Sequence, residues 1–180
     1  MALTLLLMLA VAFFAAGRVV DASMDDVERV SSVDALARVE RAIGRDLDSI
    51  GKSNRDWAAW DDTYRFMADQ NEAYLASNLP PVAIAQLDLH AMLWVDTAGD
   101  IVFGSAVDAD TGEEISLPAG LAAAARSEAM HLESETSTIA GIVMLDDGPA
   151  MITSYPVLTS AGAGPTRGAL IMVRFLDDAI

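Results

Sequence analysis

The stretch DWAAWDDTYRFMADQNEAYLASNLPPV, residues 56–82, decides the fold because a helical periodicity ends within it. Ahead of its two prolines, mostly apolar residues recur at a seven-residue spacing, which places them on one face of a helix. The consecutive prolines cannot continue that helix. We therefore predict one long helix over residues 24–78, in which Gly44 and Gly51 favour a kink or break nearby.

After the prolines, the pattern changes to the short apolar runs that are typical of β-strands. A polar excursion, DADTGEEISLP, and a helix over residues 118–133, begun by a proline in its first turn, interrupt these runs. The expected strands cover residues 89–96, 101–107, 138–145, 149–158 and 167–176. The fold class is therefore α+β: a long N-terminal helix packed on a five-stranded antiparallel sheet of PAS-like (Cache-like) type.

The first twenty residues are interpreted as a membrane-spanning helix that precedes this domain. They contain one charged residue, Arg18, and as a helix they would rise about 30 Å, roughly one bilayer core. A cleaved signal peptide and a buried core helix are the alternatives, the first disfavoured by the missing basic n-region. We predict an anchor at 1–20, a helical stalk at 21–50 and a PAS-like domain at 51–178. The protein would then lie in the plasma membrane with a single pass in this chain, its PAS-like domain in the periplasm or outside the cell.

Charge is spread unevenly along the chain, whose formal net charge is −16. Beyond Arg65, sixteen acidic residues face only three basic ones, Arg126, Arg167 and Arg174. Phosphate backbones and anionic lipids repel such a domain, so we predict no nucleic-acid binding. A charged ligand is expected to be a cation, unless one of those arginines lies in the pocket. The absence of cysteine excludes disulfides and thiolate metal sites.

The segment DWAAWDDTY supplies the first candidate site residues. Trp57, Trp60, Asp61 and Tyr64 are spaced i, i+3, i+4 and i+7, so they share one face of a continuous helix. The simpler interpretation is an aromatic helix face packed against the sheet. The functional interpretation is a pocket wall in which Asp61 pairs with a ligand amine, helped by cation–π contact with the tryptophans. Asp61 could equally accept hydrogen bonds from backbone N–H groups or pair with Arg167.

Three further residues, Asn71, Tyr155 and Arg167, complete the predicted ligand-binding set. Asn71 lies on the same helix face, Tyr155 lies in a strand, and Arg167 begins the last strand, where it satisfies a loop, a carboxylate or a ligand. His90 and His131 are interpreted as surface residues. The sequence contains no P-loop, GxGxxG, GxSxG or HExxH motif. We predict no catalytic residues, no metal site and no cofactor, and do not expect an enzyme.

Several motifs in register resemble those of the CHASE extracytoplasmic sensor domains, specifically the fourth class. DWAAWDDTYRFMADQNEAYLASNL resembles the signature helix of that family, with its W-x-x-W-D-x-x-Y core, and WVDTAGDIVFGSAVDADTGEEISLP is similar to its first hairpin. GPAMITSYPVLTSAGAGPTRGALIMVRFLD resembles its last two strands, including G-P-x-R-G before the final strand. The resemblance covers roughly residues 30–178. It implies the ligand-sensing module of a bacterial or archaeal receptor, whose output is a cyclic di-GMP enzyme (GGDEF or EAL) or a histidine kinase.

Two functions of different classes follow from these observations. The first is a membrane-anchored sensor, in which an unidentified ligand, hypothesised to be a small cation or amine, shifts the long helix. Residues 24–50 of that helix are expected to pair with a second chain as a coiled coil, giving a homodimer. The alternative is a membrane-anchored or secreted extracytoplasmic binding protein with no signalling output. A second apolar span after Ile180, followed by a catalytic domain, would distinguish the first from the second.

Overall fold

A computed structural model describes residues 2–108, 111–127, 130, 132 and 134–176 of the chain. The chain divides into two units, Met1–Arg45 and Asp46–Ile180, and each is described by itself. Residues of the first unit form the greater part of α1 (Ala2–Ala58), whose last turns belong to the second unit. Among the described residues, no helix combines the length and apolar character needed to cross a membrane, so the predicted anchor is not confirmed.

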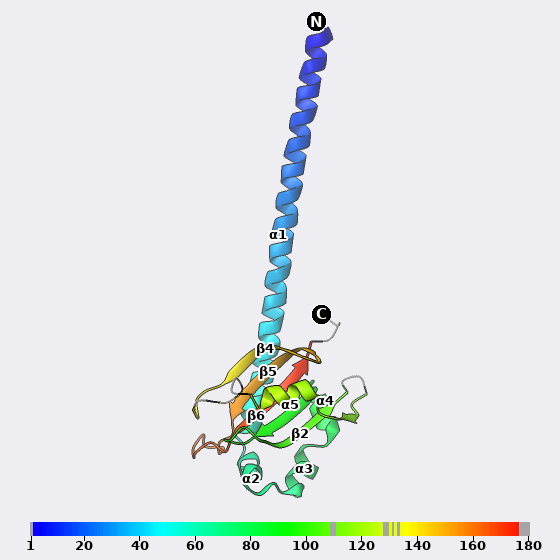
Figure 1. Ribbon diagram of the computed structural model, residues 1–180. Helices are drawn as coiled ribbons and strands as arrows, with labels where there is room; N and C mark the ends of the chain where they lie inside the picture. The colour runs from blue at the N-terminus through cyan, green and yellow to red at the C-terminus, as the bar shows by residue number, and fades with distance from the viewer. Residues whose placement is uncertain (1, 109–110, 128–129, 131, 133, 177–180) are drawn as a thin grey trace. The chain divides into compact units, whose positions relative to one another are not determined.

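The second unit combines short helices with a sheet (Figure 1). After the end of α1 come three short helices: α2 (Asp61–Asp69), α3 (Glu72–Asn78) and α4 (Pro81–Gln86). The first strands are β1 (Ala91–Val95), β2 (Ile101–Val107) and the two-residue β3 (Glu114–Ile115). After α5 (Ala119–Ala125), the chain continues with β4 (Ile139–Leu145), β5 (Gly148–Pro156) and β6 (Ala169–Phe175).

All six strands form one sheet in the order β3-β2-β1-β6-β5-β4, and every neighbouring pair is antiparallel. The last strand enters the middle of the sheet, where β6 pairs with β1 through registers such as Leu93↔Ile171. Every residue of β1 is buried, because helices cover both faces of the sheet. The α+β class and the antiparallel sheet are therefore confirmed.

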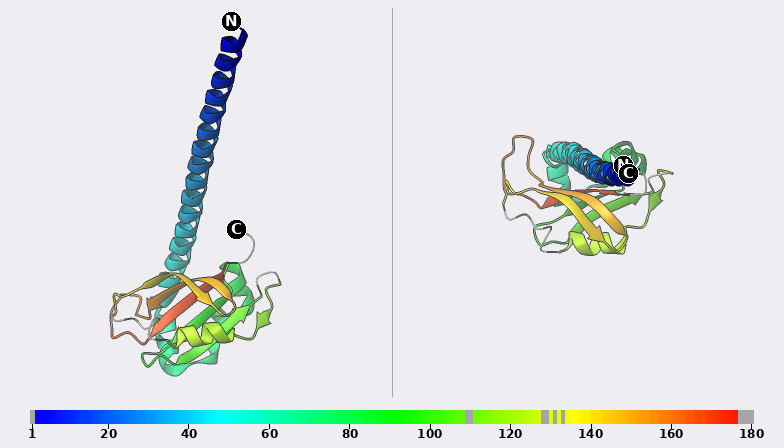
Figure 2. Two further views of the ribbon diagram at one scale, coloured as in Figure 1. Left: turned by 45° about the horizontal axis from the view of Figure 1, so that its top comes forward. Right: turned by 90° about the horizontal axis from the view of Figure 1, so that it is seen from above.

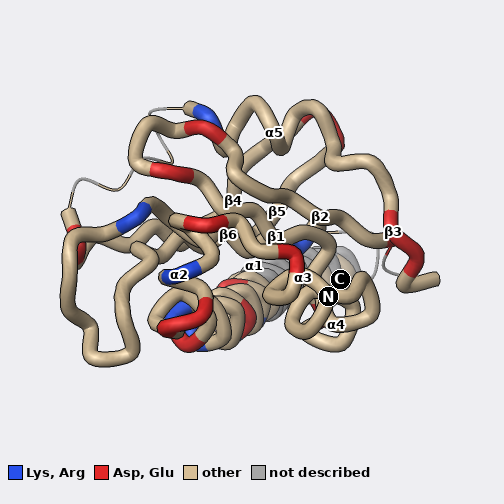
Figure 3. The backbone as a smooth tube through the Cα atoms, turned by 90° about the horizontal axis from the view of Figure 1, so that it is seen from below, with Lys and Arg blue, Asp and Glu red and all other residues tan. Residues whose placement is uncertain are grey.

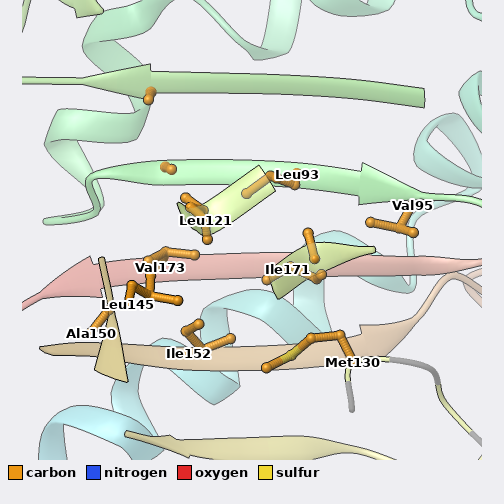
Figure 4. Packing of buried hydrophobic residues seen from close by; sticks show 12 residues of the cluster. Leu93, Val95, Leu121, Met130, Leu145, Ala150, Ile152, Ile171 and Val173 are labelled. Carbon is orange, nitrogen blue, oxygen red and sulfur yellow. The ribbon is translucent and has the colours of Figure 1, made fainter. Parts of the chain in front are cut away.

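One face of the sheet carries the end of α1 together with α2, α3 and α4, and the other carries α5 (Figure 2). The α5 face holds a cluster of buried residues to which β1, β5, β6 and α5 contribute (Figure 4). Its larger members include Leu93, Ile152, Ile171 and Leu121. On the helical face, the side-chain amide of Asn54 donates to the carbonyl oxygens of Thr153 at 2.9 Å and Leu170 at 3.0 Å. These bonds join α1 to β5 and β6.

Aromatic side chains fill the rest of the helical face. Phe66 of α2 stacks on Tyr74 of α3 with ring centroids 4.7 Å apart, and both rings meet the edge or face of Trp94 in β1. The hydroxyl groups of Tyr74 and Thr63 are 2.8 Å apart in this buried layer. Burial raises the pKa of Tyr74 to about 12. The aromatic layer therefore positions α2 and α3 on the sheet.

The continuous helix predicted over residues 24–78 is wrong, because the chain breaks twice after Ala58. Trp60 is extended, with φ −95° and ψ 136°, and Gln70 is left-handed, with φ 49°. No break occurs at Gly44 or Gly51, since both lie within α1. Gly51 instead permits close packing, because an added Cβ would lie 3.1 Å from the hydroxyl oxygen of Tyr155.

The predicted count of five strands is also wrong, because β3 forms within the stretch expected to be a polar excursion. Its two residues pair with β2 through Ala106↔Ile115 and Val107↔Glu114. A strand of two residues carries no alternation that a sequence pattern could show. The helix expected at 118–133 is shorter, since α5 ends at Ala125, and Pro118 precedes it as the N-cap. His131, in the same stretch, lies outside the described residues.

Candidate functional site

A cavity of about 210 Å³ lies on the α5 face of the sheet, at the end of β1 and the start of β6. The turn after β1 forms one wall, the segment that enters β6 forms another, and residues after α5 form a third. Its lining residues are Val95, Asp96, Thr97, Met130, Leu132, Thr166, Gly168 and Ala169. The cavity is smaller than the common range for drug-sized ligands, so it suits a small molecule.

The first wall is shaped by the TAGD turn between β1 and β2. One carboxylate oxygen of Asp96 accepts hydrogen bonds from the backbone N–H groups of Ala98 at 2.8 Å and Asp100 at 2.9 Å. Gly99 has a positive φ of 90°, which a tight turn here requires. The turn thus holds the carboxylate of Asp96, one of the lining residues, in a fixed position.

The second wall depends on a glycine. Gly168 has φ 127°, and a Cβ added there would overlap the carbonyl oxygen of Val95. The hydroxyl of Thr166 donates to the Gly168 carbonyl oxygen at 2.8 Å, which holds the two residues as one local turn. Only glycine allows the chain to approach β1 this closely before β6 begins.

The charge of the lining limits the ligands that fit. Among the described residues that line the cavity, Asp96 is the one charged group, and Thr97 and Thr166 contribute hydroxyls. Acidic residues also predominate over basic ones in the domain, as the red and blue segments of the backbone tube show (Figure 3). An anionic ligand would meet no neutralising partner in this lining, whereas a small amine or a neutral polar molecule would find acceptors.

The segment that enters β6 has a second contact, on the helical side. Arg167 lies between the two cavity residues Thr166 and Gly168, and its guanidinium stacks over the ring of Tyr64 at 3.9 Å. The same guanidinium donates to the Tyr64 carbonyl oxygen at 2.6 Å, and the Tyr64 hydroxyl donates to the carbonyl oxygen of Pro165 at 3.0 Å. One short segment therefore contacts both the cavity and α2.

The other end of the same connection touches α1. The backbone N–H of Leu158 donates to the carbonyl oxygen of Ala58, the last residue of α1, at 3.1 Å. Asp61 accepts from the backbone N–H of Ser160 at 2.9 Å, and its own N–H donates to the Ser160 hydroxyl at 3.2 Å. Residues 157–168, here called the β5–β6 connection, are thus bound to both sides of the α1–α2 corner.

Five of the seven predicted site residues meet at this corner, although not on a common helical face. Trp57 lies in the last turn of α1 and Trp60 in the helix break, with ring centroids 5.3 Å apart, and Trp60 is 43% exposed. Asp61 and Tyr64 bind the β5–β6 connection, and Arg167 is the residue of that connection that contacts Tyr64. The Asp61 carboxylate has a backbone N–H as partner, which is one of the alternatives that the sequence left open.

The remaining two predicted residues lie elsewhere. Asn71 caps α3 by accepting from the Tyr74 N–H at 2.8 Å, and its amide donates to Asp69, which lowers the pKa of that carboxyl. It lines a second cavity of about 200 Å³ between α2 and α3. Tyr155 lies under the guanidinium of Arg55 at 5.6 Å. None of the seven residues lines the first cavity.

Sequence reasoning missed the residues of the first cavity. The sequence places Asp96 at the end of the strand expected over residues 89–96 and Thr97 between two expected strands. It places Gly168 in the strand expected over residues 167–176 and in the G-P-x-R-G motif. The glycine in that motif was the available signal, because an obligatory positive φ marks a close backbone approach. The three walls come from distant parts of the chain, so no local spacing predicts the cavity.

Comparison with known proteins agrees with this architecture. The sequence model of the CHASE4 domain matches residues 42–180. The chain is 31% identical over 135 residues to the methanogenesis regulatory histidine kinase FilI of Methanothrix harundinacea (strain 6Ac), a match that covers 74% of this chain and 15% of FilI. The chain therefore spans a small part of that relative.

Two solved structures share the fold. The extracellular domain of a protein described as histidine kinase vpHK1S-Z8 superposes with a TM-score of 0.53 at 17% identity, over 77% of this chain and 54% of that one. A domain of a sensory box/GGDEF family protein from Vibrio parahaemolyticus gives 0.55 at 18% identity, over 77% and 57%. The family match spans most of the chain, including both the helical corner and the sheet. The chain belongs to the CHASE4 domain family.

Proposed function

We propose that this chain is the extracytoplasmic ligand-sensing domain of a membrane-anchored bacterial or archaeal receptor and that the cavity beside Asp96 binds the ligand. The regulated output would lie outside residues 1–180, as a histidine kinase or a cyclic di-GMP enzyme. Family membership supports a sensing role, and a histidine kinase and a GGDEF family protein are among the similar proteins. The membrane anchor at residues 1–20 is part of this proposal.

The alternation of contacts along residues 166–168 is the observation that carries the proposal. Thr166 and Gly168 line the cavity, while Arg167 between them stacks on the ring of Tyr64 and donates to its carbonyl oxygen. A ligand that displaces Thr166 or Gly168 must also displace the Arg167 backbone. Through Leu158 and Ala58, the same connection is hydrogen-bonded to the end of α1.

Signal transfer then requires only that the ligand bind two arrangements of the β5–β6 connection with unequal affinity. In one arrangement the Arg167–Tyr64 contact and the Leu158–Ala58 hydrogen bond are intact, as observed here. In the other, ligand contacts replace them and the corner between α1 and α2 loosens. The last turns of α1 carry this change out of the domain.

The ligand class follows from the charge of the site. A small amine is favoured, because Asp96 is a fixed carboxylate and no described lining residue is cationic. Asp61, which the sequence indicated as the amine partner, is exposed and lies on the helical side of the sheet. The residues Trp57, Trp60, Asp61 and Tyr64, here called the aromatic–acid cluster, stay a predicted second site. The test below distinguishes a ligand bound by Asp96 from one bound by Asp61.

The proposed receptor is a homodimer that pairs through α1. In the first unit, the described apolar side chains Val33 and Leu36 are both 61% exposed, and Val39 is 41% exposed. Val33, Leu36 and Ile43 follow heptad a and d spacing, which suits a two-stranded coiled coil. Leu36→Asp should therefore weaken self-association of the full chain, as measured by analytical ultracentrifugation.

A thermal-shift screen of the full chain against small amines, carboxylates and sugars tests the ligand assignment. Asp96→Asn keeps an oxygen for the turn but removes the charge, so it should abolish stabilisation by amines. Asp61→Asn is the matched control and should leave that stabilisation unchanged. The opposite result, in which only Asp61→Asn loses the response, would place the ligand at the aromatic–acid cluster.

Hydrogen exchange of residues 46–58 tests the signalling step with any amine that binds. Ligand should increase exchange in the wild-type chain, because the corner loosens. In Arg167→Leu the ligand should still bind, but the difference in exchange should shrink, because the contact with Tyr64 is already absent. Binding without any change in exchange at α1 would favour a binding protein that lacks signalling output.

A further inference from the structure

The strand β4 is an edge strand of the sheet without the usual protection. The strand order ends at β4, and its seven residues pair with β5 without a shift of register. Exposed edges offer free backbone groups, and proteins usually guard them with charge, proline, bulges or short length. The sequence IAGIVML contains no charge and no proline. The opposite edge is guarded, because β3 has two residues and one is Glu114.

The exposed side of β4 is apolar. Ala140, Ile142 and Met144 alternate with residues that face α5, and all three are exposed; Ile142 is 45% and Met144 76% exposed. Next to Ile142, its β5 partner Met151 is buried. An exposed apolar row along a free edge is unusual for a monomer, so this edge is a candidate interface.

Two-fold symmetry allows this edge to pair with itself. When the two-fold axis passes through Ile142, antiparallel pairing sets Ile142 opposite Ile142 of the second copy and Ala140 opposite Met144. Residues opposite one another then belong to the same face, so the exposed row meets an exposed row. If one copy were shifted along the other by a single residue, exposed residues of one strand would lie opposite core-facing residues of the other.

The length of β4 selects the same register. With the axis at Ile142, all seven residues of β4 lie opposite a β4 residue of the second copy, and Ile139 lies opposite Leu145. With the axis at Gly141 or Val143, only five of the seven would have such a partner. The turn to β5 begins directly after Leu145, so the strand cannot extend to pair further at that end. Repulsion matters in a chain with a net charge of −16, and the uncharged edge is where two such chains can meet.

We propose that β4 is an interface between two copies of this chain, paired antiparallel about a two-fold axis at Ile142. The pairing extends the sheet across both copies and shields Ile142 and Met144. The occupant is a second copy because the strand complements itself in length and in side-chain facing, and it offers no charged group to attract a different partner. This contact is separate from the coiled-coil pairing proposed for α1.

Single cysteines test the interface cleanly, because the natural chain has none. Ile142→Cys in the full chain should give mostly covalent dimer on mild oxidation, since facing residues lie within disulfide reach. Met144→Cys is the matched control. It is more exposed, yet pairing sets the two copies of residue 144 four residues apart, roughly 13 Å, which is beyond that reach. Ile115→Cys on the opposite edge should also give no covalent dimer.

A cross-link at residue 144 or 115 equal to that at residue 142 would overturn the proposal, because collision would then explain all three. Absence of a cross-link at residue 142 would overturn it as well. Adding Leu36→Asp to Ile142→Cys separates the two interfaces. The cross-link should persist. Its loss would show that the two copies pair only through α1 and that β4 forms no interface of its own.

A charge exchange provides a second test of the register. Ile142→Lys and Ile142→Asp should each lose the β4 contact, because residue 142 faces its own copy. An equal mixture of the two variants should form heterodimers in which lysine faces aspartate, measured by native mass spectrometry in the Leu36→Asp background. Mixing that yields no heterodimer would overturn the proposed register. Circular dichroism of each variant checks that the fold is retained.

Discussion

At the scale of single residues, Asn54 joins the end of α1 to the sheet. The side chain is fully buried, and its amide lies within 3.0 Å of acceptors on β5 and β6. Asn54 therefore joins the helix to the sheet by hydrogen bonds to strand carbonyl groups, as backbone N–H groups join neighbouring strands. Hydrogen bonds of this kind fix the position of the helix on the sheet, since apolar packing alone is not directional.

Asn54→Ala should lower the free energy of unfolding by about 2–4 kcal/mol, because buried carbonyl groups lose their donor. Urea denaturation of the full chain, followed by far-UV circular dichroism, measures this change. Asn78→Ala is the matched control. Its amide also donates to a carbonyl, that of Tyr74 at 3.0 Å, but in a partly buried position, so about 0.5 kcal/mol or less is expected. Equal losses in the two variants would contradict the role given to Asn54.

Tyr74 should make stability depend on pH in the alkaline range. Burial raises its folded pKa from 10.0 to about 12. Between these values the unfolded chain has released the phenol proton while the folded chain retains it, so the free energy of unfolding falls as pH rises. Below pH 10 this contribution is constant. Tyr74→Phe should show a smaller decline between about pH 9 and 12 in urea titrations, together with a loss of about 1 kcal/mol at neutral pH from the unpaired Thr63 hydroxyl. Equal slopes would contradict this assignment.

At the scale of elements, the β5–β6 connection joins the cavity to the helical corner. Its conformation rests on Gly168, whose positive φ and closeness to the Val95 carbonyl leave no space for a side chain. Gly162, in the same connection, also has a positive φ of 66°, but nothing lies within 4 Å of the position of its Cβ. Comparing an alanine substitution at each of the two glycines therefore separates the cost of backbone strain from the cost of steric overlap.

Gly168→Ala should lower the free energy of unfolding by about 3 kcal/mol or more, since strain and overlap add. Gly162→Ala should cost about 1 kcal/mol, because only the strain applies. Chemical denaturation of both variants measures this difference in stability. Of the two variants, only Gly168→Ala should also lose amine binding. A Gly168→Ala variant as stable as Gly162→Ala would show that the connection can move away from β1.

The elements also show where sequence patterns suffice. The long strands β2, β4 and β5 lie close to the predicted ranges, because an apolar run bounded by turn residues is a strong local signal. The helix breaks at Trp60 and Gln70 gave no such signal. Neither position holds glycine or proline, and the extended backbone at Trp60 accompanies contacts of Ala58 and Asp61 with a loop about one hundred residues away.

At the scale of the whole molecule, the chain consists of two units with different requirements for stability. In α1, the residues of the second unit Ile50, Asn54 and Ala58 are buried, whereas Val33 and Leu36 of the first unit are exposed. The sheet unit therefore holds its part of α1 by its own contacts. The proposed pairing of two chains through α1 would cover these exposed residues.

Removing residues 1–45 should leave the midpoint of thermal unfolding within about 4 °C of the full chain, since every residue described as buried lies at or after Ile50. Differential scanning calorimetry of both proteins at equal concentration checks this. Cooperativity should also be retained. A much lower midpoint, or the loss of a single transition, would show that the first unit contributes to the fold of the second.

The sequence by itself determined the α+β class, the apolar first segment, the antiparallel hairpins and the family, because these depend on local periodicity and on motifs in order. It also indicated the residues of the α1–α2 corner, since aromatic residues beside acids stand out in any chain. Only the tertiary structure decided that the corner binds the β5–β6 connection, that the sheet has a sixth strand, and that the cavity lies beside Asp96. Those features join segments tens of residues apart or more, and their energies come from contacts that no local window of sequence contains.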